Sequence, residues 1–169
     1  MDTRRTGQGM MTIGVILGMV MLTWFFAGVE EKQRNPNMNP ESQFSAQAVE
    51  VPLKQNRWGH YLVTGAINGE PVDFLLDTGA TDVVIPEATA QRLNLPYGRA
   101  GKAMTANGPV TVYQTVIGDL EIGGIHLRNV SASINPGMGD LEILLGMSAL
   151  RQIEFTQQGE MLTLRQHSG

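Results

Sequence analysis

An aspartate stands at the end of a short apolar run near the middle of this chain. Phe-Leu-Leu occupies 74–76, Asp77 follows, and Thr-Gly-Ala occupies 78–80. The apolar run predicts a core strand, so the carboxylate at its end should be partly buried. Because an unpaired buried charge is costly, Asp77 is expected to have a partner or a function. Without that run, Asp-Thr-Gly would predict only a turn in which Asp77 accepts backbone amides.

The elements around Asp77 read as β-structure. Short β-type runs alternate with turn signals at Asn68-Gly69, Asn107-Gly108, Gly123-Gly124 and Gln158-Gly159. Asn and Gly tolerate positive φ angles, so hairpins are predicted at all four places. Helical pattern is scarce, and only 86–93 and 147–152 predict short helices. Leu-Leu-Gly-Met at 144–147 echoes Leu-Leu-Asp-Thr at 75–78, which predicts a β fold of two similar halves.

The order of these motifs resembles the retroviral-type aspartic proteases, the retropepsin-like family, and in particular its bacterial membrane-anchored members. The resemblance covers 55–165 and rests on Asp77-Thr78-Gly79-Ala80 after its strand, the Asn107-Gly108 hairpin, and Ile-Leu-Leu-Gly-Met-Ser-Ala-Leu at 143–150. It implies an all-β, closed acid-protease barrel with one or two short helices, preceded by a single transmembrane helix. It implies no cofactor and no metal.

The resemblance also implies an activity, that of an aspartic endopeptidase. Two carboxylates about 3 Å apart share one proton, because both cannot ionise at that distance. The ionised carboxylate takes a proton from water, and the protonated one polarises the scissile carbonyl. Asp77 would be the catalytic carboxylate, Gly79 would allow the tight turn, and Thr78 would tie the two motifs together through hydrogen bonds. Ala80 and Thr81 would border the peptide or protein substrate.

Asp77 is the only acid in a Thr-Gly context, so its partner is expected from a second chain. A twofold axis places the same residue opposite itself, which predicts a homodimer with one Asp77 from each subunit. Retroviral enzymes brace the dimer with an Asp and an Arg, where this chain has Thr81 and Met147. Both bracing partners are absent together, which leaves open how tightly the isolated domain dimerises.

A hairpin over the substrate is the second implied feature. Thr105 and Ala106 would lie over an extended peptide, and Asn107 and Gly108 would form the tip; by itself the motif predicts only an ordinary surface hairpin. Four apolar residues are possible pocket walls, with core packing expected for at least half of them: Val84, Ile85, Ile143 and Leu144.

The N-terminal part of the chain contains twenty uncharged residues, Met10–Val29. At about 1.5 Å per residue, a helix of that length crosses the hydrocarbon core of a bilayer. We expect an uncleaved anchor in the inner (cytoplasmic) membrane, with a cleaved signal peptide as the alternative. Flanking Lys and Arg are balanced, and the N-terminal amine favours a protease domain on the periplasmic or extracytoplasmic side. Gly14 and Gly18 form Gly-x-x-x-Gly, which favours helix pairing.

The predicted organisation is a tail (1–9), a transmembrane helix (10–29), a polar linker (30–47) and a protease domain (48–169). The linker is predicted from its Asn, Gln and Pro content. The chain has a net charge of -4, no cysteine and no basic stripe, so nucleic acid is not an expected partner. His60, His126 and His167 show no metal-ligand spacing.

Two other functions fit the same residues. The missing bracing pair also fits a dimeric module that binds extended peptides without cutting them. A chain that is active only with a different partner subunit is a third possibility.

Overall fold

The computed structural model describes residues 3–105, 108–139 and 142–167, in two units, Met1–Arg34 and Asn35–Gly169. The first unit is a single helix, α1 (Thr3–Arg34). Within the described residues it is the one helix long and apolar enough to cross a membrane, with a mean hydropathy of 1.9 over an 18-residue window in Ile13–Arg34. A signal sequence would pass the same test. The helix continues past Val29 because Glu30-Glu31-Lys32-Gln33-Arg34 are good helix formers.

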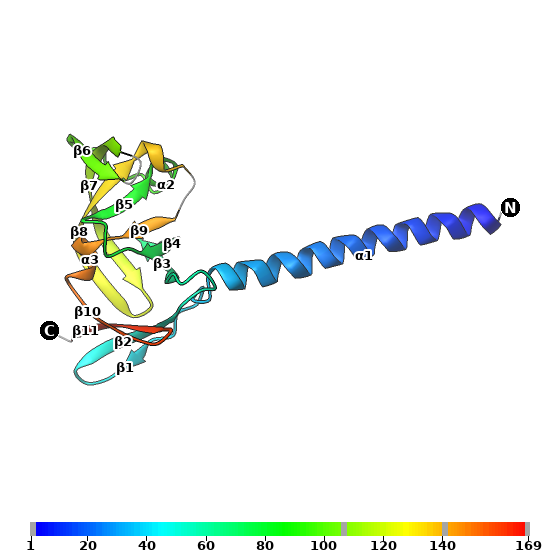
Figure 1. The fold of residues 1–169 in the computed structure, drawn as a ribbon, viewed down its shortest axis with the longest axis horizontal. Coiled ribbons are helices and arrows are strands. Elements are labelled where there is room, and N and C mark those ends of the chain that lie inside the picture. Colours follow the sequence, from blue (N-terminus) through cyan, green and yellow to red (C-terminus); the bar gives the residue numbers. More distant parts are fainter. Residues whose placement is uncertain (1–2, 106–107, 140–141, 168–169) are drawn as a thin grey trace. The chain divides into compact units, whose positions relative to one another are not determined.

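The second unit consists of two β-sheets (Figure 1). The four-stranded sheet has the order β1 (Gln43–Phe44), β2 (Ala48–Lys54), β11 (Met161–His167), β10 (Glu154–Gln158). The seven-stranded sheet has the order β3 (Leu62–Ile67), β4 (Glu70–Leu76), β9 (Ile143–Leu145), β5 (Val83–Pro86), β8 (Ile125–Asn135), β7 (Gly108–Ile122), β6 (Ala100–Thr105). An additional pairing of β3 with β7 closes the larger sheet on itself.

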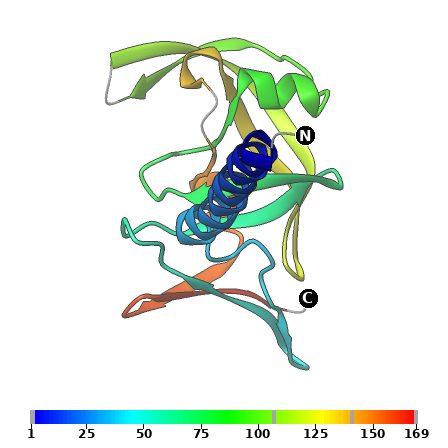
Figure 2. The same ribbon diagram turned by 90° about the vertical axis from the view of Figure 1, so that its right-hand side faces the viewer.

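The helices of this unit are short, as the sequence predicts. They are α2 (Glu87–Arg92), α3 (Met147–Leu150) and one 3-10 turn, η1 (Pro136–Met138). The mostly β fold class is therefore confirmed, and Figure 2 shows the two sheets one above the other.

The predicted hairpin turns form where the sequence places them. Asn68 and Gly69 join β3 to β4 with φ angles of 51° and 84°, the left-handed values that favour this pair of residues. Gly123-Gly124 joins β7 to β8, and Gly159 lies in the turn between β10 and β11. Asn107 lies outside the described residues.

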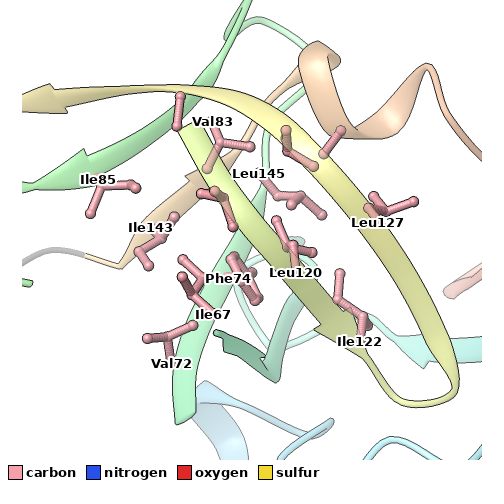
Figure 3. Packing of buried hydrophobic residues seen from close by; sticks show 14 of the residues in the cluster. Ile67, Val72, Phe74, Val83, Ile85, Leu120, Ile122, Leu127, Ile143 and Leu145 are labelled. Carbon is pink, nitrogen blue, oxygen red and sulfur yellow. The ribbon is translucent and has the colours of Figure 1, made fainter. Parts of the chain in front are cut away.

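The core lies inside the closed sheet. Side chains from β3, β4, β5, β7, β8 and β9 meet there, and Ile67, Phe74 and Leu120 are fully buried (Figure 3). Phe74 and Leu145 anchor the two strands that end at the candidate site. Burying a side chain of this size contributes about 1.5–3 kcal/mol, so these strand ends form a rigid base.

Residues 35–47, predicted as part of a linker, belong to the second unit, and the first of them pack against its strands. Asn37 is buried, and its amide nitrogen donates to the carbonyl oxygens of Lys54 (2.9 Å) and Leu62 (2.7 Å). Its side-chain oxygen accepts from the Lys54 amide at 2.7 Å. Asn35 is also buried and donates to Thr64 Oγ1 at 2.9 Å. The amide side chains that indicated a linker thus satisfy backbone groups at the ends of β2 and β3.

Candidate active site

The two echoed segments of the sequence lie side by side. β4 and β9 pair in parallel, with Leu75 opposite Leu144 and Leu76 opposite Leu145. The amide of Asp77 donates to the carbonyl oxygen of Leu145 at 3.1 Å, so the aspartate leaves its strand next to Gly146. β9 also pairs with β5 on its other side, through Val84 and Leu144. The loop 77–82 therefore starts and ends on strands that flank β9.

Asp77 opens a tight turn. Its Oδ1 accepts a hydrogen bond from the Gly79 amide at 2.9 Å, and its carbonyl oxygen accepts from the Ala80 amide at 3.2 Å. The aspartate is half-buried, whereas Thr78 and Gly79 are exposed. The turn expected from Asp-Thr-Gly is present, and it leaves the carboxylate group at the surface beside two exposed residues.

Backbone hydrogen bonds join this loop to the start of α3. The Met147 amide donates to the carbonyl oxygen of Ala80 at 2.8 Å, and the Ser148 amide donates to that of Thr81 at 2.9 Å. Ser148 Oγ donates to the carbonyl oxygen of Ser131 at 2.7 Å and accepts from the Val83 amide at 3.0 Å. Ser148 was not among the predicted site residues, because a serine in a short helix carries no signal of such bonds.

Gly146 has no room for a side chain. A Cβ atom there would collide with the carbonyl oxygen of Asp82 and come within 2.7 Å of that of Ala80. Real Cβ contacts to backbone are essentially never under 3.0 Å. The loop that carries Asp77 therefore rests directly on Gly146, and the repeated Leu-Leu pattern was the sequence signal for this position.

Thr78 is exposed, and among the described residues no hydrogen bond involves its hydroxyl group. The Asp77 loop is bonded to the second half of this chain through backbone groups of Asp77, Ala80 and Thr81. The role that the resemblance implies for Thr78 would need atoms outside this single chain.

The predicted flap is a hairpin between β6 and β7. Thr105 ends β6 and pairs with Gly108 at the start of β7, while Ala106 and Asn107 lie outside the described residues. Met104 on this hairpin is 82% exposed. Of the four possible pocket walls, two lie in the core (Ile85, Ile143) and two are half-buried opposite each other (Val84, Leu144).

No carboxylate of the described residues is hydrogen-bonded to that of Asp77. Asp73 is engaged elsewhere, since its Oδ1 accepts from Thr64 Oγ1 at 2.6 Å. One group of side chains away from the loop could hold a cation: Asp119, Glu121 and His126, whose ligand atoms lie within 4.8 Å of one another. The hairpin register brings these three together, and His126 Nδ1 is 3.6 Å from Asp119 Oδ2. The same positions also fit ion pairs of a protonated His126 with Asp119 and Glu121, without a metal.

Known proteins are similar to this chain over the segments that form the site. A family model described as "gag-polyprotein putative aspartyl protease" matches residues 63–152, which include β4, the Asp77 loop, β9 and α3. The chain belongs to the retropepsin-like aspartyl protease family. The structure of a retropepsin-like aspartic protease from Rickettsia conorii superposes with a TM-score of 0.61 and 28% identity, over 75% of this chain and 97% of that one.

Two curated relatives of this chain are proteins described as uncharacterised. An uncharacterised protein of Rickettsia prowazekii is 29% identical over 68% of this chain and 50% of its own length. An uncharacterised protein of a Sinorhizobium species is 31% identical over 64% of this chain and 48% of its own length. The chain thus spans about half the length of the curated relatives that it matches.

Proposed function

We propose that this retropepsin-like chain is a membrane-anchored aspartic endopeptidase with one Asp77 from each subunit of a homodimer. The observation that carries the proposal is the placement of Asp77: half-buried, at the end of a rigid core strand, in a turn that rests on Gly146. A single chain offers this carboxylate no carboxylate partner among the described residues. A twofold axis beside the loop would supply one.

The proposed chemistry is hydrolysis by an activated water. One Asp77 takes a proton from the water while the other, protonated, polarises the scissile carbonyl. Thr78 is exposed beside the carboxylate and is available to the second chain. Thr105, Ala106, Asn107 and Gly108 would cover the substrate, and Ala80 and Thr81 would border it.

Anchoring is part of the proposal. α1 would cross the inner membrane once and hold the protease domain on the periplasmic or extracytoplasmic side. The apolar 18-residue window within Ile13–Arg34 supports this role. Two chains whose α1 helices pair hold their protease domains at a high effective concentration. A weak contact between the folded domains would then suffice for dimerisation.

The test is cleavage of a random peptide library by the full-length protein, wild type and Asp77→Asn, from acidic to neutral pH. Asp77→Asn should abolish cleavage and leave the thermal unfolding temperature close to that of the wild type. Asp82→Asn is the matched control, because it makes the same change in the same loop and should keep cleavage. Cleavage by Asp77→Asn at the wild-type rate would contradict the assignment.

A non-cleaving peptide-binding module is the second candidate, and the absence of the bracing acid and arginine at Thr81 and Met147 favours it. It predicts that peptides bind, survive incubation at every pH of the series and bind equally well to Asp77→Asn. The library experiment therefore separates the two functions.

A further inference from the structure

A histidine and two carboxylates meet on one face of the hairpin formed by β7 and β8. Asp119 and Glu121 are two residues apart on β7, so their side chains point to the same face of the sheet. His126 on β8 lies opposite Glu121 in the register and shares that face. His126 Nδ1 is 3.6 Å from Asp119 Oδ2 and 3.9 Å from Glu121 Oε1. One nitrogen and two oxygens from two strands therefore surround a single position.

The separation of these atoms fits a zinc ion. Zn²⁺ binds histidine nitrogen and carboxylate oxygen at about 2.0–2.2 Å, and three protein ligands with one water complete a tetrahedral shell. Ligand atoms in such a shell lie about 3.4 Å apart. The side chains of Asp119, Glu121 and His126 are exposed by 35%, 34% and 52%, so they are free to close the small difference by rotation.

The two carboxylates have no cationic side chain to neutralise them. Within the described part of the chain, Asp119 Oδ1 is buried without a hydrogen-bond partner, which is costly unless a positive charge lies nearby. Arg128 is opposite Asp119, but no lysine or arginine in the described ranges forms an ion pair with either carboxylate. The pair of His167 and Glu154 differs, because Arg165 also lies 4.0 Å from Glu154. The cluster on the β7–β8 hairpin therefore has an unmet need for a cation.

Side chains from outside the hairpin fix the backbone of two of the three residues. Asn68, in the turn between β3 and β4, accepts from the Asp119 amide through Oδ1 at 3.0 Å and donates its own amide to the Asp119 carbonyl oxygen at 2.9 Å. Gln166 on β11 donates from Nε2 to the His126 carbonyl oxygen at 2.6 Å, and its Oε1 accepts from the His126 amide at 3.1 Å. Such supporting bonds hold ligands in position before an ion binds. Because β11 belongs to the four-stranded sheet, the cluster also lies where the two sheets meet.

We propose that Asp119, Glu121 and His126 form a structural binding site for Zn²⁺, with water as the fourth ligand. The ion would neutralise the two carboxylates and cross-link β7 to β8 at the junction of the two sheets. None of these residues takes part in the proposed hydrolysis, so the inference is independent of the proposed function. The spacing of the histidines along the chain does not reveal the site, because the hairpin register brings the ligands together.

The first test measures metal binding by the full-length protein, purified in detergent without a histidine tag and dialysed against a chelator. Co²⁺ is the probe, because four-coordinate Co²⁺ absorbs visible light much more strongly than the hydrated ion. One equivalent of Co²⁺ should produce this absorption, and Zn²⁺ should abolish it by displacement. Titration calorimetry with Zn²⁺ should give one site per chain. Lack of saturable binding of either ion would overturn the proposal and leave the ion pairs of a protonated His126 as the account of the cluster.

The second test removes ligand atoms with little change in side-chain size. His126→Asn and Glu121→Gln should each weaken Zn²⁺ binding at least about tenfold. The matched controls are His167→Asn and Glu154→Gln, which change the other imidazole–carboxylate pair, 3.0 Å apart, and should bind Zn²⁺ as the wild type does. Wild-type Zn²⁺ affinity in His126→Asn would overturn the proposal.

The third test measures stability. Zn²⁺ at about a hundred times its dissociation constant should raise the thermal unfolding temperature of the wild type by at least about 5 °C, because the three ligands meet only in the folded chain. His126→Asn should show no such rise. Asp77→Asn should bind Zn²⁺ and be stabilised as the wild type is, so loss of cleavage in that variant leaves the metal site intact. Stabilisation that persists in both His126→Asn and Glu121→Gln would place the ion elsewhere and overturn the proposal.

Discussion

Thr81 and Ser148 are joined by a backbone hydrogen bond, in which the Ser148 amide donates to the Thr81 carbonyl oxygen at 2.9 Å. The bond ties the Asp77 loop to α3 at the position where retroviral enzymes would have an acidic residue. A neutral side chain at 81 costs nothing there, because the backbone makes the connection. The loop is thus held within one chain, and contact with a second chain is left to other residues.

Ser148→Ala should loosen the Asp77 loop. The substitution removes the hydroxyl that bonds to the exposed Ser131 carbonyl oxygen and to the part-buried Val83 amide, and it leaves the Val83 amide unsatisfied. We expect a loss of about 1–3 kcal/mol of unfolding free energy, measured by urea denaturation. Ser131→Ala is the control, since Ser131 contributes its carbonyl oxygen and its side chain is exposed. Equal stability of the two variants would show that the Ser148 hydroxyl is not needed.

Gly146→Ala should be far more damaging than an alanine at another glycine. The new methyl group would collide with backbone oxygens of the Asp77 loop, which cannot rotate away as a side chain can. We expect a loss of at least about 2 kcal/mol and a clear drop in thermal unfolding temperature. Gly101→Ala is the control, because a Cβ at that position meets no atom within 4 Å. A Gly146→Ala protein as stable as the control would contradict the packing described here.

Asn37→Ala should destabilise the second unit, although Asn37 lies in the predicted linker. Three hydrogen bonds to backbone groups of Lys54 and Leu62 are lost together. Unsatisfied buried groups of this kind cost about 1–3 kcal/mol each, and the thermal unfolding temperature should fall accordingly. Asn39→Ala, at an exposed position two residues further on, should change little. Equal thermal unfolding temperatures for the two variants would show that the Asn37 hydrogen bonds do not contribute to stability.

Replacing Gly14 and Gly18 with leucine should weaken association of the anchored protein. Two small residues one turn apart let helices approach closely, and leucine side chains prevent that approach. Energy transfer between labelled chains in lipid bilayers should fall for the double variant. Gly28→Leu, in the same helix but outside the motif, should behave as the wild type. Unchanged transfer in the double variant would exclude this helix motif as a dimer contact.

Cleavage should be faster below neutral pH than above it. The dyad works with one shared proton, and loss of that proton as pH rises leaves two ionised carboxylates that cannot polarise the scissile carbonyl. Initial rates on a peptide from the library, measured across the pH series on folded protein, would show the trend. A rate that increases steadily into the alkaline range would point to another mechanism.

Much of the fold could be predicted because local signals agreed with the tertiary structure. Asn68-Gly69 fixed a hairpin, and the echo of 75–78 in 144–147 located the two strands that pair in parallel. The burial of Asn35 and Asn37 could not be predicted, since amide side chains have the same composition signal in a free linker and in a hydrogen-bonded one. The Ser148 bonds likewise depend on contacts between distant parts of the chain.

The glycine at 146 also has a genetic consequence. The echoed position is where a chain carrying both halves of the dyad would need its second aspartate, and the Asp77 loop fills that space. Under the proposed function every active dimer then needs an intact Asp77 in both of its chains. In a cell that makes wild-type and Asp77→Asn chains in equal amounts, random pairing leaves about a quarter of the dimers with both carboxylates. The substitution should therefore behave as a dominant-negative allele.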